Sequence, residues 1–126
     1  MLKAVRQLDY TVVLCHDLET MKAFYRSLFD FPINSESATG LTFRAGGCLL
    51  SLRQRTRAYD GSGVRPEVPG VQLAFRVAPE EVDQCHAQLR ALQVPILDPP
   101  TDQPRGHRTV YFADPEGNIL EVYAEI

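Results

Sequence analysis

Glu121 is the residue whose type and surroundings most suggest chemistry in this chain. It lies in a C-terminal hairpin, residues 108–125, in which two apolar strands flank the turn formed by residues 114–118. A carboxylate inside an apolar strand is costly unless it has a partner or a ligand. Glu121 is therefore expected either to line a ligand cleft or to lie on a solvated face opposite an arginine. Because strand side chains alternate, one face should carry Leu120, Val122 and Ala124, and the other Ile119, Glu121 and Tyr123.

The three histidines are scattered over different elements and share no pattern with Glu121. His16 follows a predicted strand and His86 lies beside the apolar stripe of a predicted helix, so both are expected at the surface or at its boundary. His107 follows the turn of residues 104–106, in a loop that can close over a ligand, and imidazole titrates near neutrality. We expect His107 to contact ligand.

The remaining reactive side chains argue against nucleophilic catalysis. Ser51 has no neighbouring histidine, and the chain contains no G-x-S-x-G elbow. Cys15, Cys48 and Cys85 are an odd number at no metal-like spacing, and each lies in an apolar pattern. They are predicted to be buried thiols in a reducing compartment.

Composition excludes several classes of protein. The net charge of -3 and the pI near 5.5 do not favour nucleic acid binding. No apolar run approaches the roughly 20 residues of a membrane span, and the N-terminus has no signal-peptide pattern. A cytoplasmic protein that binds neither nucleic acid nor membrane is expected.

The elements that position these side chains occur twice in the same order. A Val- and Thr-rich strand over residues 8–15 precedes a helix capped by Asp17 and ended by Pro32. Three short strands follow, at residues 33–37, 41–45 and 48–53. The second half repeats this order: a strand at 71–77, a helix opened by Pro79, and strands around Ile96, Val110 and Leu120. The sequence predicts an α+β fold of two βαβββ repeats, residues 1–53 and 71–126, in one domain spanning 1–126.

Residues 54–70 are predicted to link the repeats, because they are rich in Gly, Pro and charge and include Gly61-Ser62-Gly63. Arg55 and Arg57 are expected on a solvated face of this linker. Tyr59 is expected in a flap or at the surface.

Strand parity selects the residues that face away from the helices. Leu50 and Leu52 should pack toward the first helix, and Leu73, Phe75 and Val77 toward the second. Tyr10 precedes Asp17 by seven residues, as Gln72 precedes Pro79, so the two occupy equivalent positions. The opposite faces are then expected to carry Tyr10, Val12, Leu14, Ser51, Arg53, Gln72, Ala74, Arg76, Glu121 and Tyr123.

The order of elements, with LDYTVVLCHDLETMKAFYRSLFDF, GVQLAFRV and above all GHRTVYFADPEGNILEV, resembles the vicinal-oxygen-chelate superfamily. That superfamily includes glyoxalase I, bleomycin-resistance proteins, fosfomycin-resistance enzymes and extradiol dioxygenases. The resemblance covers nearly the whole chain. It implies that the repeats curl into an open cup of mixed sheet, with the helices on the outer face, and that the cup holds the ligand.

The resemblance also implies where a metal would lie. Metal-dependent relatives carry His, Glu or Gln at the positions matching Tyr10, Ser51, Gln72 and Glu121. This chain departs from the pattern, because only Glu121 is a strong donor, with Gln72 supplying a carbonyl. We therefore expect no catalytic metal. If one of Zn, Ni, Mn or Fe is bound, Glu121 and Gln72 are its expected ligands.

Arginine usage bears on the charge of the ligand. Eleven of the thirteen basic residues are Arg, and Arg53, Arg76, Arg105 and Arg108 are expected in or near the cup. If one of them neutralises Glu121, the others suit an anion. If Glu121 is free, the carboxylate beside Tyr10 and Tyr123 suits a flat cation.

Three functions follow from this pattern. The first is a metal-independent small-molecule-binding protein similar to bleomycin-resistance proteins, with Tyr10, Ser51, Arg53, Gln72, Arg76, His107, Glu121 and Tyr123 as ligand contacts. The second is a divalent-metal lyase or dioxygenase of the glyoxalase I type, in which Glu121 is the catalytic candidate. The third is a non-catalytic dimer partner with a vestigial cup. A homodimer is expected in each case, because open sheet edges favour a two-fold partner.

Overall fold

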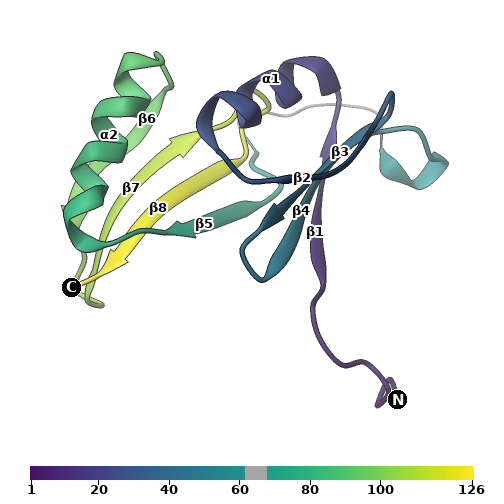
Figure 1. The fold of residues 1–126 in the computed structure, drawn as a ribbon, viewed down its shortest axis with the longest axis horizontal. Coiled ribbons are helices and arrows are strands. Elements are labelled where there is room, and N and C mark those ends of the chain that lie inside the picture. Colours follow the sequence, from purple (N-terminus) through teal and green to yellow (C-terminus); the bar gives the residue numbers. More distant parts are fainter. Residues whose placement is uncertain (62–67) are drawn as a thin grey trace. The chain divides into compact units, whose positions relative to one another are not determined.

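The computed structural model describes residues 1–61 and 68–126. The chain divides into two compact units, Met1–Gly63 and Val64–Ile126 (Figure 1). Ser62 and Gly63 of the predicted linker, with the rest of its residues up to 67, lie outside the described residues.

The first unit is a four-stranded mixed sheet with one long helix. Its elements are β1 (Tyr10–Cys15), α1 (Leu18–Leu28), β2 (Ile33–Ser37), β3 (Gly40–Ala45), β4 (Cys48–Gln54) and the short 3-10 helix η1 (Ala58–Asp60). The strand order is β1-β4-β3-β2. Strand β1 runs parallel to β4, and the other neighbours are antiparallel.

The second unit repeats this topology. Its elements are β5 (Gln72–Arg76), η2 (Pro79–Glu81), α2 (Val82–Ala91), β6 (Ile96–Asp102), β7 (His107–Ala113) and β8 (Ile119–Glu125). The order is β5-β8-β7-β6, with β5 parallel to β8 and the other pairs antiparallel. The predicted α+β class and the two βαβββ repeats are therefore confirmed.

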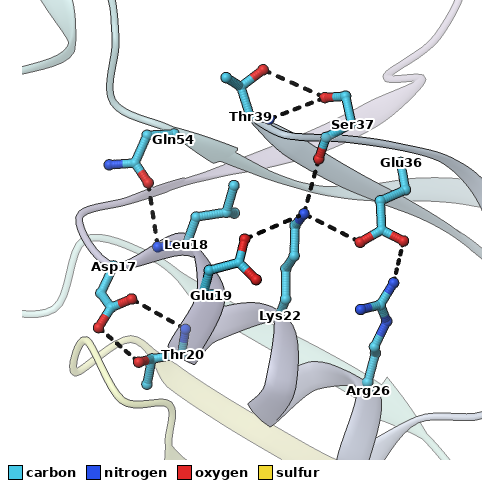
Figure 2. Close-up of polar contacts among 10 residues, drawn as sticks. All are labelled: Asp17, Leu18, Glu19, Thr20, Lys22, Arg26, Glu36, Ser37, Thr39 and Gln54. Carbon is cyan, nitrogen blue, oxygen red and sulfur yellow. Dashed lines mark hydrogen bonds and ion pairs between the residues drawn. The ribbon is translucent and has the colours of Figure 1, made fainter.

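Helix α1 begins where the sequence predicts. Asp17 accepts hydrogen bonds from the backbone N and the hydroxyl of Thr20 at 3.2 and 2.7 Å, and Gln54 Oε1 accepts one from Leu18 N at 3.3 Å (Figure 2). These bonds satisfy N–H groups that have no partner within the helix, and the Asp17 carboxylate cap favours a helix start at this residue. The helix ends at Leu28, because Phe29 is already extended.

Lys22 of α1 binds the edge strand β2 through a hydrogen bond and an ion pair. Its side chain is buried, and Nζ donates to Ser37 O at 2.9 Å and lies 3.2 Å from Glu36 Oε2 (Figure 2). Arg26 contacts the other oxygen of Glu36. All five residues of β2 are exposed, so these polar contacts substitute for the apolar packing that the strand lacks.

Each unit has a core between its sheet and its helix. In the first unit Met21 and Tyr25 of α1 are completely buried, together with strand residues that alternate with exposed ones. In the second unit Val82 and Leu89 of α2 are buried in the same way. A fully buried Leu or Phe contributes about 1.5–3 kcal/mol, so these side chains hold each helix on its sheet. The buried apolar strand residues are Val13, Cys15, Leu41, Phe43, Leu50, Leu52, Val110, Phe112, Leu120, Val122 and Ala124.

Three local predictions need correction. Cys15 is buried as predicted, but Cys48 is exposed and Cys85 is intermediate, because Cys48 directly follows the Gly46-Gly47 turn at the tip of the β3–β4 hairpin. Leu92, predicted on the apolar stripe of the second helix, is half exposed because α2 ends at Ala91. Part of the predicted linker is the ordered helix η1.

Among the described residues, none of the helices combines the length and the apolar character of a membrane-spanning segment.

Candidate functional site

Glu121 lies on the sheet face that parity predicts, opposite the helix side of β8. Its neighbours Leu120 and Val122 are buried toward the helix, and Glu121 itself is only 6% exposed. Gln72 Nε2 donates a hydrogen bond to Glu121 Oε1 at 3.1 Å. No basic side chain among the described residues of the second unit pairs with this carboxylate. Gln72, not an arginine, is thus its partner in this unit.

Ala74 and Tyr111 flank Glu121 on the neighbouring strands. Both are its register partners, Ala74 on β5 and Tyr111 on β7. Arg105 Nη2 donates to the Tyr111 hydroxyl at 2.8 Å. Sequence reasoning missed Tyr111, although the alternation of HRTVYFA places it on the face shared by His107 and Thr109. A carboxylate, an amide and a phenol therefore share one face of the second sheet.

His107 and Tyr123 extend this face along the strands. His107 is the first residue of β7, not a loop residue as predicted. Its ring lies 4.7 Å from the Tyr123 ring, centroid to centroid, at an interplanar angle of 30°. The two rings pack against each other, and Tyr123 lies two residues along β8 from Glu121.

The first unit carries a hollow of about 500 Å³ on its corresponding face. Its walls include three of the predicted residues, Tyr10, Ser51 and Arg53. Val12 and Leu14, which parity also places on this side, are part of the same lining. Sequence reasoning missed four further lining residues: Asn34, Thr42, Leu49 and Arg57. Two of them had a readable signal in strand alternation, Leu49 with Ser51 and Arg53 on its own strand, and Thr42 on the neighbouring strand.

The two units match residue by residue at these faces. Ser51 pairs in register with Val12 and Thr42, as Glu121 pairs with Ala74 and Tyr111. The Thr42 and Ser51 hydroxyls lie 2.9 Å apart in a hydrogen bond. The repeat therefore carries a neutral hydroxyl pair in one unit where the other has a carboxylate and a phenol.

Arg53 is not available as a lone cation. Its Nη1 and Nη2 donate to the two oxygens of the buried Asp60 at 2.9 and 2.8 Å. Asp60 also accepts from the backbone N of Thr56 and of Arg57. The hydrogen bond from the Arg53 guanidinium, with those backbone donors, holds the pKa of the Asp60 carboxyl far below its usual range. This cluster orders the start of the predicted linker.

Arg76 and Arg108, which the sequence also predicts near the ligand, both have acidic partners. Arg76 pairs with Glu125 at 3.1 Å between two exposed side chains. Arg108 is the register partner of Ala124 and bonds Asp83 and Asp102, so it belongs to the helix side and not to the ligand face. Hydrogen bonds to these two carboxylates raise the pKa of Arg108.

The other two histidines lie where the sequence predicts, because His16 is exposed and His86 is half-buried.

Neither unit by itself offers the donor set of a catalytic transition metal. Glu121 has Gln72 and Tyr111 as polar neighbours in its unit, and the matching first-unit positions hold a phenol at Tyr10 and a hydroxyl at Ser51. Zinc, nickel and iron sites are built from several His, Cys or carboxylate ligands. In the part of the chain that the structure describes, no three such side chains lie close enough to hold an ion.

Comparison with known proteins agrees with this architecture. The chain is 25% identical to the metallothiol transferase FosB of Lysinibacillus sphaericus, covering 94% of this chain and 82% of that protein. A crystal structure of a glyoxalase/bleomycin resistance protein/dioxygenase from Nocardioides has a TM-score of 0.82 at 25% identity, covering 97% of this chain and 85% of the other. Lactoylglutathione lyase from Agrobacterium tumefaciens has a TM-score of 0.75 at 26% identity, covering 97% and 96%.

The family model matches residues 7–122, which include both repeats and nearly all of the chain. The match extends from the approach to β1 through Glu121 in β8. The chain belongs to the Glyoxalase/Bleomycin resistance protein/Dioxygenase superfamily.

Proposed function

We propose that this chain binds a small organic molecule on the strand faces opposite its helices, without a catalytic metal. The observation that carries the proposal is the Gln72–Glu121 hydrogen bond at a buried carboxylate. The proposed contacts are Tyr10, Ser51, Arg53, Gln72, Arg76, His107, Glu121 and Tyr123.

Glu121 supplies the polar centre of the proposed site. Gln72 occupies Oε1, and no donor among the described residues of the second unit reaches Oε2. A largely buried carboxylate oxygen binds a donor more strongly than an exposed one, because it has less water to lose. A ligand N–H or O–H is the expected partner, and the His107–Tyr123 rings suit an adjacent flat group.

Metal content separates this proposal from its main alternative. A divalent-metal transferase, lyase or dioxygenase is the second candidate, because similar proteins are named metallothiol transferase and lactoylglutathione lyase. We expect protein purified without chelator to contain well under one equivalent of Zn, Ni, Mn or Fe by elemental mass spectrometry. One equivalent of any of them would overturn the metal-free proposal.

Ligand binding is tested by a thermal-shift screen of small organic molecules on the full chain. We expect compounds that stabilise the wild type and lose about tenfold in affinity in Glu121→Gln, the loss of one charge-assisted hydrogen bond. Glu80→Gln is the matched control, because Glu80 is exposed on η2 and loses the same charge. A complete absence of stabilising compounds would instead favour a non-catalytic partner with a vestigial site.

We further propose that the protein is a cytoplasmic homodimer. Strands β1 and β5 each end their sheet, and such edges are commonly covered by a partner. All three cysteines are free thiols, which suits a reducing compartment. We expect light scattering to give the molecular mass of a dimer. We expect cell fractionation to recover the protein in the soluble cytoplasmic fraction. A monomer at micromolar concentration, or recovery outside the cytoplasm, would contradict this assignment.

A further inference from the structure

The first-unit hollow has the size and wall composition of a site for a small molecule with an apolar body. Its volume of about 500 Å³ lies within the usual range of roughly 300–1,000 Å³ for ligand pockets. Val12 and Leu14 of β1 and Leu49 of β4 form apolar wall. Val12 is 38% exposed and Tyr10, at the start of β1, 52%, so apolar surface on this strand remains open to a ligand.

Apart from Arg53 and Arg57, the polar part of the wall is neutral. The Thr42 and Ser51 hydroxyls are bonded to each other, and each retains further capacity to accept or donate. None of the lining residues that the structure describes is Asp or Glu. A cationic ligand would find no carboxylate in this lining.

Of the two arginines in the lining, Arg53 and Arg57, only Arg57 has no acidic partner among the described residues. Arg53 is matched in charge by Asp60 through two hydrogen bonds. Arg57 contributes only its backbone N to Asp60, at 2.8 Å, which fixes this residue at the hollow. Its guanidinium bonds the neutral Tyr59 hydroxyl at 3.3 Å, and no acidic side chain among the described residues pairs with it. Its planar donor fork thus remains available to an oxyanion.

We infer that the first-unit hollow binds an amphipathic organic anion, with its apolar body against Val12, Leu14 and Leu49 and its carboxylate or phosphonate group at Arg57. This inference rests on the proposed small-molecule-binding function and adds the charge of the ligand. It changes the role of Arg57, which the sequence assigned to a solvated face of a linker. The ordered η1 segment, anchored by Asp60, is what brings that residue to the site.

The test uses two ligands of similar size and opposite charge, phenylphosphonate and benzylamine. Each is titrated into the full-length protein and followed by amide chemical shifts in 15N-labelled samples. Phenylphosphonate should shift amides of Thr42, Ser51 and Arg57 and bind more tightly than benzylamine. Arg57→Gln should weaken phenylphosphonate binding about fivefold, the effect of one exposed charge contact, and should reduce its salt dependence.

Arg90→Gln is the matched control, because Arg90 is exposed on α2 and its loss changes the net charge equally. It should leave phenylphosphonate binding unchanged. The inference would be overturned if phenylphosphonate did not bind, or if benzylamine bound as tightly. It would also be overturned if Arg57→Gln and Arg90→Gln weakened phenylphosphonate binding equally, or if the amide shifts were confined to other residues. Those results would leave the proposed function intact if compounds from the screen still bind in a Glu121-dependent way. If compounds from the screen bind without depending on Glu121, while phenylphosphonate binding still depends on Arg57, only the Glu121 site would be overturned.

Discussion

Gln72 Nε2 donates a hydrogen bond to Glu121 Oε1 at 3.1 Å, across the parallel strands β5 and β8. Gln72 is the register partner of Ile119, so its side chain reaches diagonally to a residue two positions further along β8. The bond satisfies a carboxylate that the apolar strand otherwise leaves poorly solvated. The stability of the second unit and the polarity of the proposed site therefore depend on the same contact.

We predict that Gln72→Leu lowers the free energy of unfolding by about 1–2 kcal/mol, because it leaves a buried acceptor without its donor. Urea unfolding followed by circular dichroism measures this change. Gln88→Leu, at an exposed position of α2, is the control and should have little effect. Equal losses in the two variants would show that the Gln72–Glu121 bond contributes nothing specific.

Asp60→Asn is predicted to destabilise the first unit in a pH-dependent way. The folded-state pKa of Asp60 lies below its ordinary value of 3.8, mainly through the Arg53 hydrogen bond. A lowered folded pKa means that the stabilisation is full above about pH 5 and is lost as the pH falls below about 4. The difference in unfolding midpoint between wild type and variant should shrink over that range.

The exposed Asp30→Asn variant supplies the baseline for the Asp60 experiment. It should show no comparable dependence on pH. A difference between wild type and Asp60→Asn that stays constant from pH 7 to pH 3 would contradict the ionic role of Asp60.

Lys22→Ala should loosen β2 without unfolding the sheet. The substitution removes the bond to Ser37 O and the pairing with Glu36, the main contacts that tie this exposed strand to α1. Hydrogen exchange of residues 33–37 should become roughly fivefold to tenfold faster, the effect of losing about 1 kcal/mol of local stability. The exposed Lys3→Ala is the control, and unchanged exchange in β2 would refute the tethering role of Lys22.

Thiol labelling is predicted to follow the order Cys48, then Cys85, then Cys15. Cys48 is exposed, whereas burial, aided by Glu81, raises the pKa of the Cys85 thiol and lowers its thiolate fraction. Cys15 is fully buried and requires opening of the core. Timed alkylation with peptide mass spectrometry gives the order, and Cys48→Ser should remove the fastest phase. Labelling of Cys15 before Cys48 would contradict the burial described for the first unit.

The strand pattern was largely readable from sequence because its determinants are local. Strands β2, β3 and β4 lie within one residue of their predicted bounds, since Gly40 and the Gly46-Gly47 turn separate apolar stretches. The face of Glu121 followed from side-chain alternation alone. Extending that alternation to β3 and β7 would also have identified Thr42 and Tyr111.

The Arg53–Asp60 cluster was not predictable in the same way. The segment that forms the cluster has the composition of a linker. It is ordered because the backbone N–H groups of Thr56 and Arg57 both donate to the Asp60 carboxylate. Such convergence depends on turn geometry, which a count of Gly and charged residues does not specify. The choice of Gln72 as partner of Glu121 likewise depends on the diagonal geometry of two strands far apart in sequence.

We propose that ligand binding by this chain depends on Glu121 and not on a metal. The most direct measurement is the calorimetric affinity of the best compound from the thermal-shift screen, for protein treated with chelator and for untreated protein, in wild type and Glu121→Gln. We expect the same affinity with and without chelator in the wild type and about tenfold weaker binding in Glu121→Gln. Binding that disappears on chelation and returns with added divalent ion would contradict it.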